Sequence, residues 1–591
     1  MMAAVTILVL SGSILFLTVV GGGLFPATVG LAAASVCLLS CLVTLRGGSP
    51  DAPEVAPAPD PRLEIILAAI LIFVLITTLP LPPRLDPLAG ALRHQQNQAV
   101  TLAFDQASRA GIPAPQEVPW FSLTRNRAGT LRFFLLLSGA FGAATLVSRM
   151  SSKWKLAHLH VLAVLGATVG IAGWIAQWKI PQGNTIWWIL PIPPAPTSPV
   201  GCFLNRNHFG GFVAMLCPLA LALADHAFTR RRWLAMMFHL GLTGVMMGVV
   251  FMSLSRGAML AMVAGLGVVA LLIAFRRSRV RGAVLIVLML AGGLLVTSRM
   301  APVHERLSDL HNPAGLTSVQ SRLAEWRETL RVWPHYPLIG AGMNALRMVY
   351  PQYRRTSVGA RLINAENEYL QLLAEGGLVG AGLAILLAVT FRRRMGNTPD
   401  SPAGVLVVGA TGAMTVTGVH CLMDFPAHLP LYALVLGSIA GLLLPPLPQG
   451  LPARRRLLFS LPALIGLVGT LVILMNHPVT LKILDDPDYL HTSKYRNLYR
   501  ALVWAPTSSA WLYLGHAMVR EGTMRGSQEL CAAGESFIAR AALLDPNNYK
   551  LWYQLGETRL ALNMNAEAAE AFQRAHQLRS WLTPPPIPET H

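Results

Sequence analysis

A short polar cluster, Glu366, Asn367 and Glu368, stands directly before an apolar stretch in the segment INAENEYLQLLAEGGLVG, residues 363–380. Ionisable groups at a membrane boundary cost free energy unless partners, a wet cavity or a function offset that cost. A carboxylate in such a place can accept a proton, and partial burial would raise its pKa usefully. We therefore expect this segment to handle a polar substrate.

Arginine is the second residue type that points to chemistry. The loop at 299–368 holds nine arginines and no lysine: Arg299, Arg306, Arg322, Arg327, Arg331, Arg347, Arg354, Arg355 and Arg361. Because the planar guanidinium fork matches phosphate and carboxylate oxygens, the loop predicts an anionic ligand. The alternative is a solvated helix face, on which Arg322, Arg327 and Arg331 pair with Glu325 and Glu328.

Two further polar groups border apolar stretches. Arg256, in SLSRGAML, lies in a short turn on the side of the membrane where positive charge is disfavoured, which favours a functional role. Arg206, Asn207 and His208 begin another apolar stretch, in the sequence NRNHFGG. Asn207 is there either a helix N-cap or a ligand.

His420 and Asp424, in VHCLMDFPAHLP, are four residues apart and are expected on one face at the end of a helix. They would either hydrogen-bond each other or take part in chemistry. The six cysteines are Cys37, Cys41, Cys202, Cys217, Cys421 and Cys531. Their spacing does not suggest a disulfide framework or a metal site, so we expect neither a metal nor a cofactor.

The composition that surrounds these residues is that of a polytopic membrane protein. Of 591 residues, 53% are hydrophobic and only 13% charged. A membrane span needs roughly 20 apolar residues, and thirteen helices of this kind are predicted. They cover residues 2–20, 27–45, 63–80, 131–147, 158–177, 208–225, 233–253, 257–275, 282–298, 369–390, 404–421, 429–446 and 457–475.

The net charge of +19 reports topology and not a nucleic-acid partner, because basic residues cluster at alternate span ends. These clusters are Arg46, Arg149 with Lys153 and Lys155, Arg230 to Arg232, Arg276 to Arg281, Arg392 to Arg394 and Arg454 to Arg456. The positive-inside rule places them in the cytoplasm together with the N-terminus. The loops 82–130, 178–207 and 299–368, and the chain after about 476, are then expected outside.

The chain divides into a membrane domain, residues 1–475, and a tail, residues 476–591. In the tail Trp511, Leu514 and Gly515 recur forty-one residues later as Trp552, Leu555 and Gly556, and the second copy continues to Ala568, Phe572 and Ala575. The pattern is typical of tetratricopeptide repeats, of about 34 residues, with an insertion near 522–529. Two unrelated amphipathic helices are the alternative. Such a repeat tail would form an α-solenoid that binds a peptide or a partner protein.

The ordered motifs resemble the O-antigen ligase and polymerase superfamily over residues 63–446. The motifs are NRNHFGG, SLSRGA, Arg322-x3-Trp326 with PLIGAGMNAL, NEYLQLLAEGGLVG and His420-x3-Asp424-Phe-Pro. The resemblance implies a metal-independent, GT-C-like glycosyltransferase of the bacterial inner membrane. Its donor would be an undecaprenyl-diphosphate-linked glycan at the periplasmic face, and its acceptor a glycan, lipid or protein.

The resemblance also implies roles for individual residues. Arg256 and Arg322 occupy motif positions that would stabilise the leaving diphosphate. Many relatives have His before the Asn of NEYLQ, whereas this chain has Glu366, which is either the general base or a group that orients the acceptor or pairs with an arginine. The other expected substrate-binding residues are Arg206, Asn207, His208, Asn367, His420 and Asp424.

Several functions remain open from the sequence. Within the family a ligase moves a finished glycan, whereas a polymerase extends it on the carrier. A polysaccharide transporter is a different class, and such transporters usually show related halves and broken helices near mid-membrane. This sequence shows neither similarity between its halves nor charges in mid-span. A non-catalytic membrane scaffold that acts through the repeat tail is the third class.

Overall fold

The computed structural model describes most of the chain, in eleven continuous stretches and a few isolated positions. The stretches are 2–20, 26–46, 60–81, 121–178, 180–191, 200–299, 313–355, 364–394, 403–445, 451–476 and 507–579. The isolated positions lie between 98 and 109 and between 495 and 502, and include 447 and 585. Most of the predicted loop 82–130 therefore lies outside the described residues.

Each of the thirteen predicted spans coincides with an α-helix. These helices are α1 (Met2–Val19), α2 (Pro26–Leu45), α3 (Arg62–Thr78), α5 (Arg127–Ser148), α6 (Ser152–Trp178), α7 (Arg206–Thr229), α8 (Trp233–Met252), α9 (Arg256–Arg276), α10 (Arg279–Arg299), α14 (Glu368–Arg394), α15 (Ala403–His420), α16 (Pro430–Leu443) and α17 (Ala453–Asn476). Within the described residues, eight helices are long and apolar enough to cross a membrane, and three shorter apolar helices accompany them. The chain is an all-α polytopic membrane protein, while the count of thirteen spans stays a prediction.

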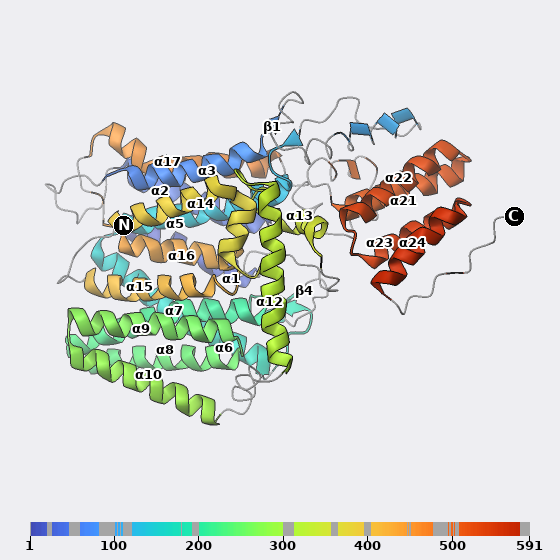
Figure 1. Cartoon of the computed structure of the whole chain (residues 1–591). Helices are drawn as coiled ribbons and strands as arrows, with labels where there is room; N and C mark the ends of the chain where they lie inside the picture. Colours follow the sequence, from blue (N-terminus) through green and yellow to red (C-terminus); the bar gives the residue numbers. More distant parts are fainter. Residues whose placement is uncertain are drawn as a thin grey trace.

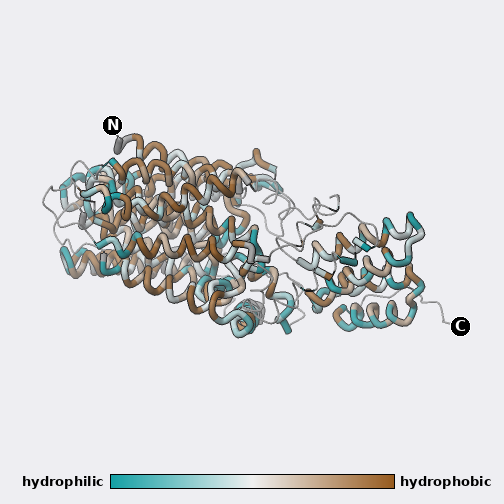
Figure 2. Tube along the Cα trace, turned by 90° about the horizontal axis from the view of Figure 1, so that it is seen from above, coloured by the Kyte–Doolittle hydropathy of each residue, from teal (hydrophilic) through white to brown (hydrophobic). Residues whose placement is uncertain are grey.

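The helices lie side by side in one bundle whose two ends differ (Figure 1). One end, called here the loop end, carries α12 (Pro313–Val332), α13 (Leu346–Tyr353) and two antiparallel strand pairs. The strands are β1 (Pro80–Leu81), paired with β2 (Phe121–Ser122), and β3 (Thr185–Ile186), paired with β4 (Leu190–Pro191). Figure 2 shows hydrophobic chain through the middle of the bundle and hydrophilic segments at its ends.

The predicted basic clusters gather at the opposite end, where several are held by specific contacts. Arg149 forms a buried ion pair with Glu64 at 3.5 Å, and Arg456 donates to the carbonyl oxygen of Leu45 at 2.8 Å. Asp225 binds both Arg277 and Arg281. The alternation of basic and polar loops in the sequence therefore corresponds to the two ends of the bundle.

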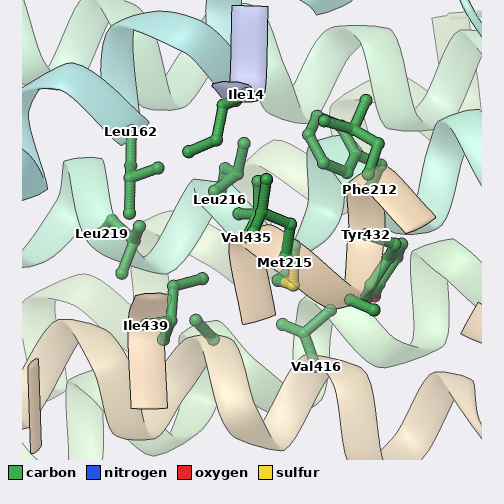
Figure 3. Close-up of a cluster of buried hydrophobic side chains, with 14 of the residues drawn as sticks. Ile14, Leu162, Phe212, Met215, Leu216, Leu219, Val416, Tyr432, Val435 and Ile439 are labelled. Atoms are coloured by element: carbon green, nitrogen blue, oxygen red, sulfur yellow. The ribbon is translucent and has the colours of Figure 1, made fainter. Parts of the chain in front are cut away.

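Helix α7 lies at the centre of the bundle, and 89% of its most apolar segment is buried. Its side chains meet those of α1, α6, α15 and α16 in the cluster of Figure 3, which includes Ile14, Leu162, Phe212, Met215, Leu216, Leu219, Val416, Tyr432, Val435 and Ile439. Because α7 is enclosed on all sides, the residues at its first turn are held inside the protein and not in the lipid.

Helices α5 and α16 approach closely through small residues. A Cβ atom added to Gly437 would lie 2.1 Å from the carbonyl oxygen of Ala140, and one added to Gly441 would lie 2.5 Å from that of Ala144. Small residues at a four-residue spacing are a common way for membrane helices to pack backbone against backbone. This contact fixes α16 and thus the turn that precedes it at the loop end.

The loop 299–368, called here the large loop, contributes described segments that lie at the loop end of the bundle. One of them is bound to a kink in α14. Gly377, inside α14, has a φ of 61°, and Gly340, in the loop, has a φ of 71°. A side chain at Gly340 would not fit, because an added Cβ would lie 2.1 Å from the carbonyl oxygen of Glu375. The carboxylate of Glu375 accepts the backbone N–H groups of Asn344 and Leu346 at 2.7 and 2.8 Å. The segment from Gly340 to Leu346 is therefore fixed against α14.

The tail forms two helical hairpins, α21 (Ser508–Arg525) with α22 (Gln528–Leu544), and α23 (Tyr549–Ala561) with α24 (Asn565–Leu578). The repeated glycines occupy matching places: Gly515 faces Ile538 across the first hairpin, and Gly556 faces Phe572 across the second. The predicted insertion lengthens α21, which has 18 residues against 13 in α23. The assignment to tetratricopeptide repeats stays a prediction.

The tail contacts the large loop just after α13. The guanidinium of Arg354 lies 3.2 Å from the carboxylate of Asp545, and both side chains are about nine-tenths buried. The side-chain amide of Asn547 donates to the carbonyl oxygen of Arg354 at 2.8 Å. A charged pair and a hydrogen bond therefore join tail and loop.

Replacing Asp545 with asparagine should loosen this contact, because it leaves the buried guanidinium of Arg354 without its carboxylate. We expect the free energy of local opening to fall by about 2 kcal/mol, which hydrogen exchange of α13 and α22 would measure. Glu521→Gln is the matched control, since it breaks the solvent-exposed pair with Arg525 in the same tail. Equal exchange in both variants would contradict the role of the Asp545 pair.

Candidate functional site

Polar side chains from five segments converge at the loop end. His208 comes from the first turn of α7, Arg322 from α12, and Glu366 from the residues before α14. His420 ends α15, and Asp424 lies in the turn between α15 and α16. Short contacts join these residues in two groups, one centred on Asp424 and the other on Glu366.

Asp424 is the buried centre of the first group, with 1% of its surface exposed. Its carboxylate lies 3.2 Å from Nε2 of His208 and 3.5 Å from Nε2 of His420, and it accepts the backbone N–H of Phe425 at 2.8 Å. Burial alone would raise the pKa of Asp424, but the two histidines, His208 above all, outweigh it and hold the pKa below the usual value. Asp424 is therefore ionised.

The expectation that His420 and Asp424 share one helix face is wrong, because α15 ends at His420. Their predicted contact does occur, since the chain turns back after the helix. The ring of His420 lies against α7 at Gly211, where an added Cβ would come within 2.3 Å of it. A glycine is thus required there for His420 to fit between the two helices.

The alternative that Asn207 caps α7 is wrong. The N-cap is Asn205, whose side chain accepts the backbone N–H of Asn207 at 2.9 Å. Asn207 is therefore inside the helix and is not the cap, although it remains half-buried near the site. His208 follows it and packs edge-on against Phe425, with ring centroids 4.7 Å apart.

Arg322 and Glu366 form the second group. The guanidinium of Arg322 donates to the carbonyl oxygen of Met423 at 2.7 Å and reaches the Glu366 carboxylate at 3.5 Å. The side chains of Arg322 and Glu366 are 31% and 25% exposed, so a ligand can reach both. The alternative pairing along α12 holds for Arg331, which contacts Glu328 at 2.8 Å. Arg322 instead faces the site.

Glu366 is unusual in both backbone and charge. Its φ of 50° lies in the left-handed region, which a non-glycine residue adopts only where surrounding structure holds it. Burial, followed by the nearby negative charge of Asp424, raises the pKa of Glu366 to about 7 against the opposing effects of Arg322 and His208. Near neutral pH, Glu366 can therefore either hold or accept a proton.

Asn367 ties the start of α14 to the turn. Its side-chain oxygen accepts the backbone N–H groups of Tyr369 and Leu370, both at 3.1 Å. Its amide donates to the carbonyl oxygen of Leu422 at 3.2 Å. The oxygen thus caps α14 and the amide binds the turn after α15, whereas the sequence suggested contact with a substrate.

Arg256 and Arg206 begin α9 and α7. Ser255 caps α9, and an added Cβ on Gly257 would lie 3.3 Å from Cβ of Met423. Arg256 therefore opens its helix beside Met423, the residue whose carbonyl oxygen binds Arg322. The first turn of α9 and the side chain of Arg322 therefore both lie against Met423.

A buried network behind the site was not predicted. His428 lies 2.9 Å from Glu368 and 3.4 Å from Glu375, and Gln371 donates to Glu375 at 3.3 Å. Burial alone would lower the pKa of His428, but the two carboxylates raise it to about 10, so the imidazole is charged. The spacing of Glu368, Gln371 and Glu375 along one helix face could have revealed these partners, whereas nothing in the sequence pairs them with His428.

The site offers arginines for an anion and a carboxylate for proton transfer. Within the stretches that the structure describes, no group of three or more His, Cys, Asp or Glu side chains is arranged to hold a metal ion. The chemistry that these residues can themselves supply is stabilisation of negative charge and general base catalysis.

Residues 241–385 match the family model described as O-antigen ligase. The match includes Arg256, Arg322, Glu366 and Asn367, and it ends inside α14. No curated protein matches the chain.

The Arg322→Gln variant should raise the pKa of Glu366 above about 7, because Arg322 is the leading group that lowers it. An opposite charge at this distance is worth about one pH unit. Infrared titration of the carboxyl band of purified protein, with Glu366→Gln as the reference, would measure the change. Arg331→Gln is the matched control, since its partner is Glu328. A midpoint that is unchanged or lower in Arg322→Gln would contradict the assignment.

Proposed function

We propose that this chain, which residues 241–385 place in the O-antigen ligase superfamily, is a glycosyltransferase that uses an undecaprenyl-diphosphate-linked glycan. The acceptor is a hydroxyl group on another glycan, a lipid or a protein. The observation that carries the proposal is the accessible pair of Arg322 and Glu366, 3.5 Å apart, in which the carboxyl group has a pKa of about 7.

The reaction needs two kinds of help. The acceptor oxygen attacks the anomeric carbon of the donor while the bond from that carbon to the diphosphate oxygen breaks. The diphosphate leaves on its lipid with the bonding electrons, and Arg322 and Arg256 stabilise its negative charge. The proton of the acceptor hydroxyl passes to the carboxylate of Glu366. Arg206 lies at the same end of the bundle and adds positive charge near the donor.

The remaining residues hold this pair in place. Asp424 and His420 are each 1% exposed, so they act on the substrate through neighbouring groups. Asp424 holds His208 by a contact of 3.2 Å, and its charge helps to keep the pKa of Glu366 high enough for proton transfer. Asn207 lies beside His208 in the first turn of α7, and Asn367 joins the start of α14 to the turn after α15. In this proposal Arg322 and Glu366 contact the substrate, while the buried Asp424 and His420 hold them in position.

The orientation in the membrane follows from charge. The basic residues gather at the end opposite the loop end, and the positive-inside rule assigns that end to the cytoplasm. The loop end, the site and the tail then face the periplasm of a bacterial inner membrane. A lipid-linked donor would reach the site from the outer leaflet.

The Glu366→Gln variant should abolish transfer and leave donor binding intact, because glutamine has the size of glutamate but cannot take the proton. General base catalysis is worth about 10²–10⁴-fold. Transfer from lipid-linked glycan in proteoliposomes and binding of the same donor would be measured in parallel. Glu325→Gln, a neighbouring half-buried carboxyl on α12, is the control that keeps transfer. Normal turnover of Glu366→Gln would rule out the base.

Transfer should also depend on pH around the pKa of Glu366. Only the ionised carboxylate accepts a proton, so the rate should rise as the pH increases through about 7 and then level off. The Glu366→His variant, which restores the residue of many relatives, should keep part of the activity with a comparable profile. A rate that is constant between pH 5 and 9 would exclude titration of this residue in the reaction.

Ligase and polymerase differ in what accumulates when the gene is deleted. Long glycan on the lipid carrier indicates a ligase, whereas single repeat units on the carrier indicate a polymerase. Analysis of the surface glycan and of the lipid-linked intermediates from the same cells distinguishes the two.

A further inference from the structure

A second cationic region lies at the junction of bundle, large loop and tail. The residues just before α5 contact the loop, since the backbone N–H of Arg125 donates to the carbonyl oxygen of Ala341 at 2.8 Å. The tail contacts the same loop through Arg354 and Asp545. Segments that are more than four hundred positions apart in the chain therefore meet in one place.

Two arginines at this junction have no negative partner. Arg125 is only 6% exposed, and Arg540, on α22, is partly buried. The Nε atom of each is buried without a hydrogen-bond partner, and within the described stretches no carboxylate pairs with either guanidinium. Helix α22, which carries Arg540, contacts α13, and burial and the positive charge of Arg125 both lower the pKa of Arg540. This arrangement differs from the neighbouring Arg354, which has Asp545.

Tyrosines border the same place. Tyr353, at the end of α13, stacks on His335 with ring centroids 4.3 Å apart. Its hydroxyl is buried without a hydrogen-bond partner in the described part of the chain. Burial and the nearby Tyr336 raise the pKa of Tyr353, while the positive charge of Arg125 acts in the opposite direction. A neutral phenol group is a hydrogen-bond donor, so it adds to the donors of the two guanidinium groups.

Two like charges without a counter-ion are costly in a partly buried setting, where water screens them weakly. A negative ligand that binds between the groups would offset that cost. Two guanidinium groups and a phenol offer several N–H and O–H donors, which fit the oxygen atoms of a carboxylate or phosphate.

We propose that Arg125 and Arg540, with Tyr353, form a second oxyanion site that binds an acidic group of the glycan. The site is separate from the transfer site. Arg322 faces Glu366 at one part of α12, and Glu328, six residues further along, accepts the backbone N–H of Arg355 near the junction. Six helical residues span about 9 Å. A glycan bound at Glu366 can therefore extend along α12 towards the tail.

This inference rests on the proposed function and narrows its substrate class to acidic glycans, whose charge is either a uronate carboxylate or a phosphate substituent. It also gives the tail a direct role, because Arg540 belongs to α22. The tail would contribute to the binding of the substrate itself, in addition to any protein that it binds.

The test measures binding to the purified full chain in lipid nanodiscs by calorimetry, without any transfer reaction. The probes are tetragalacturonate, inorganic phosphate and the neutral maltotetraose. The wild type should bind at least one acidic probe more tightly than the neutral one. Stronger binding of tetragalacturonate identifies a carboxylate as the ligand, and stronger binding of phosphate identifies a phosphate substituent.

Arg125→Gln and Arg540→Gln should each weaken binding of the acidic probe by about tenfold or more, because each removes charge-assisted hydrogen bonds. Arg540→Lys should lose less, since it keeps the positive charge. Arg574→Gln, which changes an exposed arginine on α24, is the matched control and should bind as the wild type does. Arg540 is less buried than Arg125, so its variants test the proposal even if Arg125→Gln does not fold.

Equal binding of acidic and neutral probes by the wild type, or unchanged binding in both arginine variants, would overturn the proposal. The proposed transfer reaction has a separate test. Glu366→Gln should bind the acidic probe normally while transfer is lost. If the probe does not bind but the wild type transfers glycan, only the second site is wrong. If the probe binds but no lipid-linked glycan is transferred, the proposed function is wrong.

Discussion

The site depends on one constraint, the burial of the Asp424 carboxylate at the edge of an apolar bundle. A buried charge is tolerated only with partners, and Asp424 has His208 from α7 and His420 from α15. These contacts bring α7 and the turn after α15 together. The charge of Asp424 also acts on Glu366, whose pKa rises to about 7. The charge of Asp424 therefore both holds the helix ends together and raises the pKa of Glu366.

A second buried group holds the large loop where it can contribute Arg322. Protonated His428 lies between Glu368 and Glu375, and Glu375 in turn accepts two backbone N–H groups from the loop. The described part of the loop around Asn344 and Leu346 is held in place because its backbone is bound to α14 at Glu375, two residues before the kink at Gly377. A guanidinium group held in this way can stabilise charge without reorganising during the reaction.

At the junction with the tail, buried charges also need partners, but only one of the three arginines has a carboxylate beside it within the described residues. Arg354 has Asp545 as its partner, and that pair joins the tail to the loop. Arg125 and Arg540 lack such a partner within the described residues, and a negative ligand would compensate their charge. If the proposed second site binds an acidic group, the tail contributes Arg540 to the same binding surface as the bundle.

The sequence by itself determined the helices of the bundle and the spacing of the tail repeat, because apolar runs and a 41-residue recurrence are local patterns. It also singled out Arg256, Arg322 and Glu366, whose roles stay predictions; in the structure Arg322 contacts both Glu366 and the carbonyl oxygen of Met423. Only the tertiary structure decided that Asn205 and not Asn207 caps α7, that Asp424 follows the helix, and that His428 pairs with Glu368 and Glu375. These contacts join residues from separate segments, and a pattern along one chain carries no information about which distant groups will share a buried space.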